Sequence, residues 1–193
     1  MIKTDLPIYL ASRSPRRRKL LKQMGIKFKS FSVNLDEKIN GGEKPVHLVK
    51  RLSIEKLELA RKKIKSGLII TADTIVWCND MVLDKPVDPS DAGRILREIS
   101  GNTHEVITGV ALLSANRETS FYSSTKVTFE KLSDEEIDFY VQNFKPYDKA
   151  GAYGIQEWIG IAACSRIEGS YFNVMGLPVQ QVYQELKKFV KIL

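Results

Sequence analysis

The stretch between residues 105 and 132 constrains the fold most. Two β-rich runs, residues 105–115 and 120–132, follow one another with only a short break about Asn116 and Arg117. We expect these runs to pair as an antiparallel hairpin. A simple doubly wound sheet is thereby excluded, because its parallel strands require a crossover helix between successive strands.

Helix and strand signals alternate along the rest of the chain. A strand over Ile8–Ala11 leads into a helix that Ser14 can cap, with Pro15 at its first position and Gly25 just past its end. Further helices are expected over residues 45–65, after Asp88 up to Gly101, behind the capping box of Ser133 and Glu136, and from Pro178 onward. Further strands are expected over residues 68–72, in a hairpin across Asn79 and Asp80, and as short strands over residues 159–167. The pattern predicts the α/β class with mixed α+β character: an elongated mixed β-sheet flanked by helices.

The length of 193 residues fits one large domain or two small lobes that share a core. We expect a single domain over 1–193, with two lobes sharing one core. No apolar run reaches the roughly 18 residues that a membrane-spanning helix needs. The basic cluster near the N-terminus follows a short apolar stretch, whereas a signal peptide has the opposite order. We therefore expect a cytoplasmic protein with no membrane partner.

The formal net charge is +7, which attracts polyanions in general and cannot separate a nucleic-acid binder from a nucleotide enzyme. His47 and His104 are the only histidines, so a multi-histidine zinc centre is excluded. We expect His47 to be exposed and His104 to anchor a loop. Cys78 and Cys164 are expected to be buried, reduced thiols. Any metal must be held by carboxylates and phosphates, which favours Mg²⁺ or Mn²⁺.

The first candidate site is the turn formed by Ser12, Arg13 and Ser14, directly before a helix N-terminus. Free backbone N–H groups and the helix dipole make such a turn an anion site. Arg16 and Arg17 lie in the first helical turn, where positive charge opposes the dipole. A bound phosphate would accept bonds from both guanidinium groups. The setting therefore favours a phosphate site over a surface basic cluster.

Asp73 is the second candidate. It follows the strand over residues 68–72, where we expect a turn in which a carboxylate can bind metal or act as a base. A turn-forming aspartate without chemistry fits the fragment equally well. Lys56 interrupts the apolar stripe of the helix over 45–65, so its ammonium either extends to the surface or reaches into a site. Lys85 follows the hairpin and is expected to share a cleft with Asp73.

The third candidate is the segment DKAGAYGIQ, residues 148–156. Its glycines and alanines permit close approach of the backbone to a flat ligand. Gln156 offers both a donor and an acceptor, as the edge of a pyrimidine requires. Small residues serve tight packing equally well, so this pattern is weak in isolation.

Together these segments resemble the Maf family of nucleotide pyrophosphatases. The resemblance runs from about Ile8 to the last helix and rests on ordered motifs at residues 10–17, 72–74, 83–86, 100–104 and 176–178. Residues 148–156 further resemble the branch that acts on dTTP and UTP, and differ from the branch that acts on 7-methyl-GTP. The resemblance implies the two-lobed mixed sheet of inosine triphosphate pyrophosphatases, with a central cleft.

The resemblance also implies roles for individual residues. Asp73 matches the family's proposed proton acceptor, and Glu37, Lys56 and Lys85 match further polar residues of the catalytic cleft. We expect Asp73 and Glu37 to hold a divalent metal cation, Mg²⁺ or Mn²⁺. The expected substrate-binding residues are Ser12, Ser14, Arg16, Arg17, Thr74, Lys149 and Gln156.

The chain departs from the family's pattern at Asp84, where Gly or Glu is frequent, and at Glu157, where a Gly usually follows the glutamine. Neither departure removes an expected catalytic group. The expected reaction is in-line attack of water on the α-phosphorus of dTTP or UTP, normal or modified, which yields the monophosphate and pyrophosphate.

Two rival functions stay open at this point. One is a pyrophosphatase acting on 7-methyl-GTP or purine triphosphates, and the other is a basic nucleic-acid-binding regulator. No nucleic-acid partner is expected on the main hypothesis. The resemblance also implies homodimerisation, a house-cleaning role and a possible link to cell-division arrest.

Overall fold

The computed structural model describes residues 4–39, 42–115 and 117–190. The chain divides into two compact units. The first comprises Met1–Asp73, Thr108–Ser123 and Gly176–Leu193, and the second comprises Thr74–Ile107 and Ser124–Met175. Three of the four boundaries fall inside strands, each of which contributes residues to both units: β3 (Leu68–Cys78), β5 (Thr103–Ser114) and β6 (Arg117–Phe129). The expectation of a single domain with two lobes stays a prediction.

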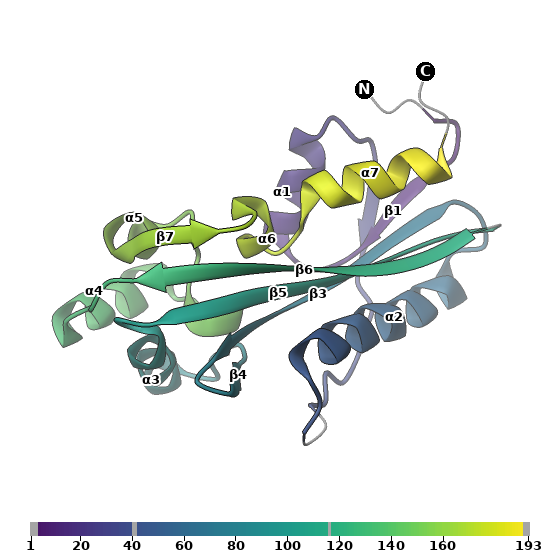
Figure 1. The fold of residues 1–193 in the computed structure, drawn as a ribbon. Helices are drawn as coiled ribbons and strands as arrows, with labels where there is room; N and C mark the ends of the chain where they lie inside the picture. The colour runs from purple at the N-terminus through teal and green to yellow at the C-terminus, as the bar shows by residue number, and fades with distance from the viewer. Residues whose placement is uncertain (1–3, 40–41, 116, 191–193) are drawn as a thin grey trace. The chain divides into compact units, whose positions relative to one another are not determined.

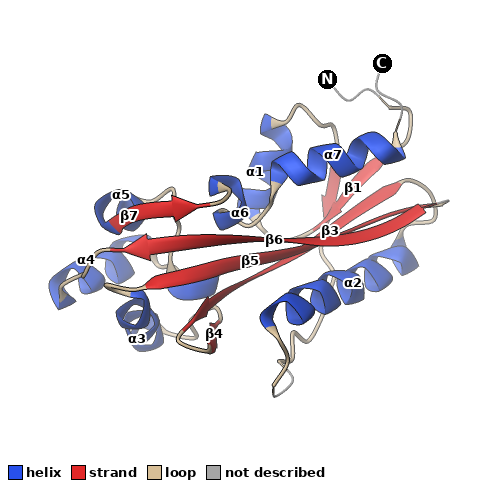
Figure 2. Ribbon diagram, in the orientation of Figure 1, coloured by secondary structure: helices blue, strands red, loops and turns tan. Residues whose placement is uncertain are grey.

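The described strands form one seven-stranded mixed sheet in the order β2-β1-β3-β5-β6-β7, with β4 paired to β3 (Figure 2). The remaining strands are β1 (Ile8–Ala11), β2 (Lys29–Phe31), β4 (Met81–Leu83) and β7 (Cys164–Glu168). β1 pairs parallel to β2 and β3, with Tyr9 opposite Lys29 and Ile69. β4 and β7 pair antiparallel to β3 and β6. The predicted mixed sheet flanked by helices is confirmed, whereas the predicted hairpin break at Asn116 lies outside the described residues.

Three helices belong to the first unit: α1 (Pro15–Gln23), α2 (Pro45–Lys63) and α7 (Val179–Phe189). α2 lies along one side of the strands, and α1 and α7 lie along the other (Figure 1). α2 buries its predicted stripe of Val49, Leu52, Lys56 and Ala60. Its backbone comes close to β5 at Gly109, where an added Cβ would lie 2.2 Å from the carbonyl oxygen of Val49. Only glycine permits this approach, which sets the helix close against the sheet.

The other elements belong to the second unit: α3 (Pro89–Ile99), α4 (Asp134–Phe144), the 3₁₀ turn η1 (Ala150–Ala152), α5 (Trp158–Ala163) and α6 (Tyr171–Val174). The predicted caps are confirmed, since Asp88 accepts from the N–H of Asp91 and Ser133 forms a capping box with Glu136. α3 and α4 lie side by side, joined by an ion pair of 2.8 Å between Arg97 and Asp134. No helix among the described residues is long and apolar enough to cross a membrane.

Three sequence-based predictions are wrong in detail. The short strands expected over residues 159–167 are the helix α5 followed by β7, because the N–H of Ile161 donates to the carbonyl of Glu157 and starts a helical turn. Asp73 lies in the middle of β3 and not in a turn, since the strand continues through the apolar residues up to Cys78. Cys164 is only half-buried, although Cys78 is buried and both thiols are free as expected. The helix α6 was not predicted at all.

Candidate active site

The turn before α1 is built as the sequence predicts. The N–H of Ser14 donates to the hydroxyl oxygen of Ser12 at 3.1 Å, and the hydroxyl oxygen of Ser14 accepts from the N–H of Arg17 at 3.3 Å. Ser12 is buried, whereas Arg16 is half-buried in the first helical turn. The two serines therefore shape the helix N-terminus, the position at which an anion is favoured.

Arg17 donates to two backbone carbonyls and, at 3.5 Å, to the hydroxyl oxygen of Ser12. Its Nε donates to the carbonyl oxygen of Gly176 at 2.8 Å, and its Nη1 donates to that of Ala72 at 2.8 Å. Burial lowers the pKa of Arg17, while the neighbouring carboxylate of Asp73 opposes that shift. Arg17 thus fastens the N-terminus of α1 to the residue directly before Asp73.

Lys56 reaches into the candidate site and does not extend to the surface. Its side chain leaves the buried face of α2, and the residue is only 9% exposed. Its Nζ forms an ion pair of 2.7 Å with Glu37, which lies in the segment between β2 and α2. The same Nζ donates a short hydrogen bond to Asp73. Both predicted metal ligands and one predicted catalytic lysine are therefore brought together within the first unit.

The environment of Asp73 perturbs its carboxyl group. The residue is 5% exposed, and burial raises its pKa above the ordinary value. Lys56 and Arg17 pull the pKa down, whereas the negative charge of Glu37 raises it further. A carboxylate whose pKa lies closer to neutrality is a better proton acceptor at neutral pH than an exposed one.

The two carboxylates also suit a divalent cation. Carboxylate oxygens of Asp73 and Glu37 both contact the ammonium of Lys56. A cation bound at this place would therefore have two carboxylate ligands. The described residues contain no group of three or more His, Cys, Asp or Glu side chains able to hold a metal. Mg²⁺ is usually held by one or two carboxylates, substrate phosphates and water, so this donor set fits Mg²⁺ or Mn²⁺.

The other predicted residues belong to the second unit. Thr74 follows Asp73 in β3 and is half-buried, and Lys85 is exposed in the segment after β4. Lys149 is buried, with its Nζ 3.1 Å from Asp148 and 3.2 Å from Glu157. Gln156 is half-buried, and its Nε2 donates to Glu157 at 3.4 Å. The roles assigned to these residues stay predictions.

The segment over residues 148–156 is held by groups that sequence reasoning largely missed. Tyr140 of α4 accepts from the N–H of Gly154 at 3.0 Å and donates to Glu157. His104 lies 2.8 Å from the hydroxyl of Tyr153, measured from Nε2, so it anchors this segment as expected. Burial lowers the pKa of His104 to about 4, so the ring is neutral at pH 7. The sequence signals for this network were the loop-anchoring role expected of His104 and the departure at Glu157.

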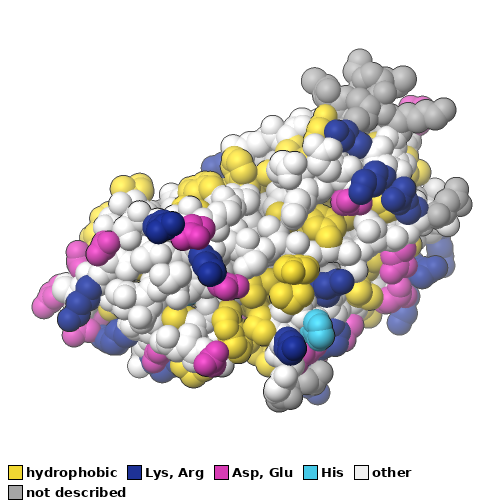
Figure 3. All heavy atoms as spheres, in the orientation of Figure 1, with side chains coloured by type: hydrophobic (Ala, Val, Ile, Leu, Met, Phe, Trp, Pro, Cys, Tyr) yellow, Lys and Arg dark blue, Asp and Glu magenta, His cyan; other side chains and the backbone are white. Residues whose placement is uncertain are grey.

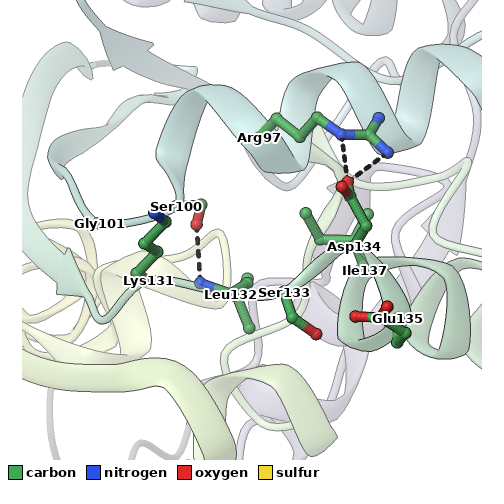
Figure 4. A pocket seen from close by; sticks show the side chains of 9 residues that line it. All are labelled: Arg97, Ser100, Gly101, Lys131, Leu132, Ser133, Asp134, Glu135 and Ile137. Carbon is green, nitrogen blue, oxygen red and sulfur yellow. Dashed lines mark hydrogen bonds and ion pairs between the residues drawn. The ribbon is translucent and has the colours of Figure 1, made fainter.

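A pocket of the second unit contains none of the predicted site residues. It lies between the end of α3 and the start of α4, where the Arg97–Asp134 ion pair spans its wall (Figure 4). The Ser100 hydroxyl oxygen accepts from the N–H of Leu132 at 2.8 Å. Two pairs of lining residues, Arg97 with Asp134 and Ser100 with Leu132, are thus bonded to each other, and the α4 N-terminus is closed by its capping box.

Comparison with known proteins decides the family. The family model described as Maf-like protein matches residues 7–189. The chain belongs to the Maf family. A relative from Phocaeicola vulgatus, named dTTP/UTP pyrophosphatase, is 49% identical over 94% of this chain and 95% of its own length. A Flavobacterium johnsoniae protein of the same name is 42% identical over 98% of this chain and its full length.

Solved structures confirm the fold of this Maf-family chain. A HAM1 protein from Coxiella burnetii aligns with a TM-score of 0.55 at 14% identity, over 95% of this chain and 99% of its own. The Ham1 protein of Staphylococcus aureus aligns with a TM-score of 0.51 at 13% identity, over 94% and 99%. At such low identity these matches support the architecture and say nothing about chemistry.

Proposed function

We propose that this Maf-family chain hydrolyses dTTP and UTP to the monophosphate and pyrophosphate. The observation that carries the proposal is the shared name of relatives, dTTP/UTP pyrophosphatase, at 42–49% identity over nearly the whole chain. The geometry agrees with it: a buried carboxylate, a second carboxylate and a lysine meet beside a helix N-terminus that favours anions.

In the proposed reaction, a water oxygen attacks the α-phosphorus, and the bond from this phosphorus to the bridging oxygen of the β-phosphate breaks. Pyrophosphate leaves with the electron pair of that bond. Asp73 accepts the proton of the water, a role supported by the burial that raises its pKa. Lys56, Lys85 and Arg16 are proposed to offset the charge that develops on the leaving group.

A divalent cation, Mg²⁺ or Mn²⁺, is proposed to bind Asp73 and Glu37. Such an ion would neutralise phosphate charge and lower the pKa of a bound water. Direct binding tests this without turnover: we expect Mn²⁺ to bind the wild-type protein, as followed by paramagnetic resonance. Glu37→Gln should weaken that binding, and unchanged Mn²⁺ affinity in Glu37→Gln would remove Glu37 from the ligand set.

Product analysis tests the function. Purified protein is incubated with dTTP, UTP, CTP, ATP and 7-methyl-GTP, with and without Mg²⁺ or Mn²⁺. We expect monophosphate and pyrophosphate from dTTP and UTP. The same products from another base would move the specificity to a rival branch, and no turnover by folded protein with metal would refute the proposal.

The nucleic-acid alternative gains no support from the face drawn in Figure 3. On that face, Lys and Arg side chains of the described residues are interspersed with Asp and Glu and do not form a continuous basic stripe (Figure 3). Salt-dependent DNA binding without triphosphate turnover would support this alternative.

We also propose a cytoplasmic location and a homodimer for the pyrophosphatase. Cell fractionation would test the location, and sedimentation equilibrium would test the oligomeric state.

A further inference from the structure

Glu157 collects three hydrogen-bond donors within the second unit. Its carboxylate accepts from the hydroxyl of Tyr140, lies 3.2 Å from Lys149 Nζ, and accepts from Gln156 Nε2 at 3.4 Å. Tyr140 is itself fixed, because it is fully buried and accepts from the N–H of Gly154. Glu157 is therefore held in place from two sides, by a tyrosine of α4 and by a buried lysine.

This arrangement determines which way the amide of Gln156 faces. An ionised carboxylate only accepts hydrogen bonds, so the amide nitrogen of Gln156 must face Glu157 and the amide oxygen must face away. That oxygen, Oε1, is buried and has no hydrogen-bond partner among the described residues. An unpaired buried acceptor is costly, and a ligand that donates a hydrogen bond to it recovers that cost.

We propose that Glu157 is a positioning residue that fixes the Gln156 amide so that Oε1 accepts the N3–H of a uracil or thymine ring. The inference rests on the proposed function and states how uracil and thymine are selected over cytosine. Uracil and thymine carry a donor at N3, whereas cytosine carries an acceptor there. A carbonyl oxygen held toward N3 therefore pairs with the first two bases and opposes the third.

A purely structural role for Glu157 makes a different prediction. If the carboxylate only neutralised Lys149, any loss of negative charge beside that lysine would have the same effect. Asp148 provides the matched comparison, because its carboxylate lies 3.1 Å from the same Nζ. The two carboxylates thus share a lysine, and the bond from the amide nitrogen of Gln156 goes to Glu157.

The experiment compares Glu157→Gln with Asp148→Asn. Both changes are nearly isosteric and remove one charge. Only Glu157→Gln changes the partner of Gln156: the new amide can donate as well as accept, so the Gln156 amide is free to rotate and present its nitrogen to the ligand. The readouts are the ratio of kcat/KM for UTP over CTP, and the ratio of calorimetric affinities for UMP over CMP. We expect both ratios to fall about tenfold in Glu157→Gln, the worth of one hydrogen bond of about 1.4 kcal/mol, and to hold within about twofold in Asp148→Asn.

Tyr140→Phe is a second variant, which removes one restraint on Glu157 while retaining the ring. Its ratios should fall less than those of Glu157→Gln. Unchanged ratios in folded Glu157→Gln would overturn the inference, as would an equal fall in Asp148→Asn. If the wild-type protein cleaves no triphosphate, the proposed function fails, whereas the UMP and CMP affinities still test the inference by themselves.

Discussion

Replacing Lys56 by Met leaves two acidic side chains without the cation that they share. Met retains most of the apolar stem that packs on the buried face of α2, so the main loss is the ammonium. Asp73 is then buried with a raised pKa and without its nearest positive charge. We expect Lys56→Met to destabilise the folded protein.

The magnitude follows from how buried each partner is. Removing one partner of a buried ion pair typically costs about 3–5 kcal/mol. The side chain of Asp73 is 7% exposed and that of Glu37 is 29% exposed, so water relieves part of the penalty at Glu37. We therefore expect a loss of about 3 kcal/mol, which for a chain of this size lowers Tm by about 6–12 °C.

Urea denaturation over a range of pH checks this expectation, with the exposed Lys62→Met on the same helix as the control. A carboxyl whose pKa is raised in the folded state costs stability above its unfolded pKa, and that cost disappears as pH falls and the group is protonated. The deficit of Lys56→Met should therefore shrink from pH 7 toward about pH 4. A deficit equal to that of Lys62→Met, or one independent of pH, would refute the reasoning.

Three further predictions concern single residues. Asp73→Asn should lower kcat by roughly 10²-fold or more in a UTP turnover assay, and near-normal turnover would remove Asp73 from the chemistry. The pKa of His104 is about 4 in the folded protein, against about 6.5 for an exposed histidine. The unfolded state therefore binds the proton more readily, and stability is lost as pH falls from 6.5 to 4, by about 3 kcal/mol. His104→Gln, which can still bond Tyr153, should flatten that part of the denaturation profile, and an unchanged profile would contradict the assignment. Gly109→Ala should cost about 3 kcal/mol in urea denaturation because its Cβ would meet the backbone of Val49, and unchanged stability would show that the helix moves freely away from the strand.

Local signals predicted most of the helices and their ends. Ser14, Asp88 and Ser133 cap helices at the expected positions, because a cap depends on a few neighbouring residues and little else. The exceptions are α5 and α6; at α5 the alternation of Ile159, Gly160 and Ile161 is typical of a strand. There the hydrogen bonds to the Glu157 carbonyl override the pattern, and their formation is not visible in the residue types.

The sequence was enough to predict which residues belong to the candidate site, but not how they are arranged. The apolar stripe of α2 identified Lys56 as a misfit, but the sequence could not show that its ammonium lies between Glu37 and Asp73. These residues are far apart along the chain, and only the fold brings them together. Tyr140 gave no signal, since a tyrosine on an apolar helix face is typical of ordinary core packing.

The two short hydrogen bonds of Arg17 differ from the other contacts of the site because their acceptors are backbone atoms and not side chains. Both acceptors at 2.8 Å are backbone carbonyls, those of Ala72 and Gly176, and every amino acid carries such an oxygen. Side-chain changes at those two positions therefore leave the acceptors themselves in place, whereas lysine at position 17 could not supply both donors from a planar fork. In a saturation mutagenesis experiment, position 17 should reject lysine for want of these two donors, while positions 72 and 176 are constrained for other reasons, since Ala72 is fully buried and Gly176 has a φ of 103°.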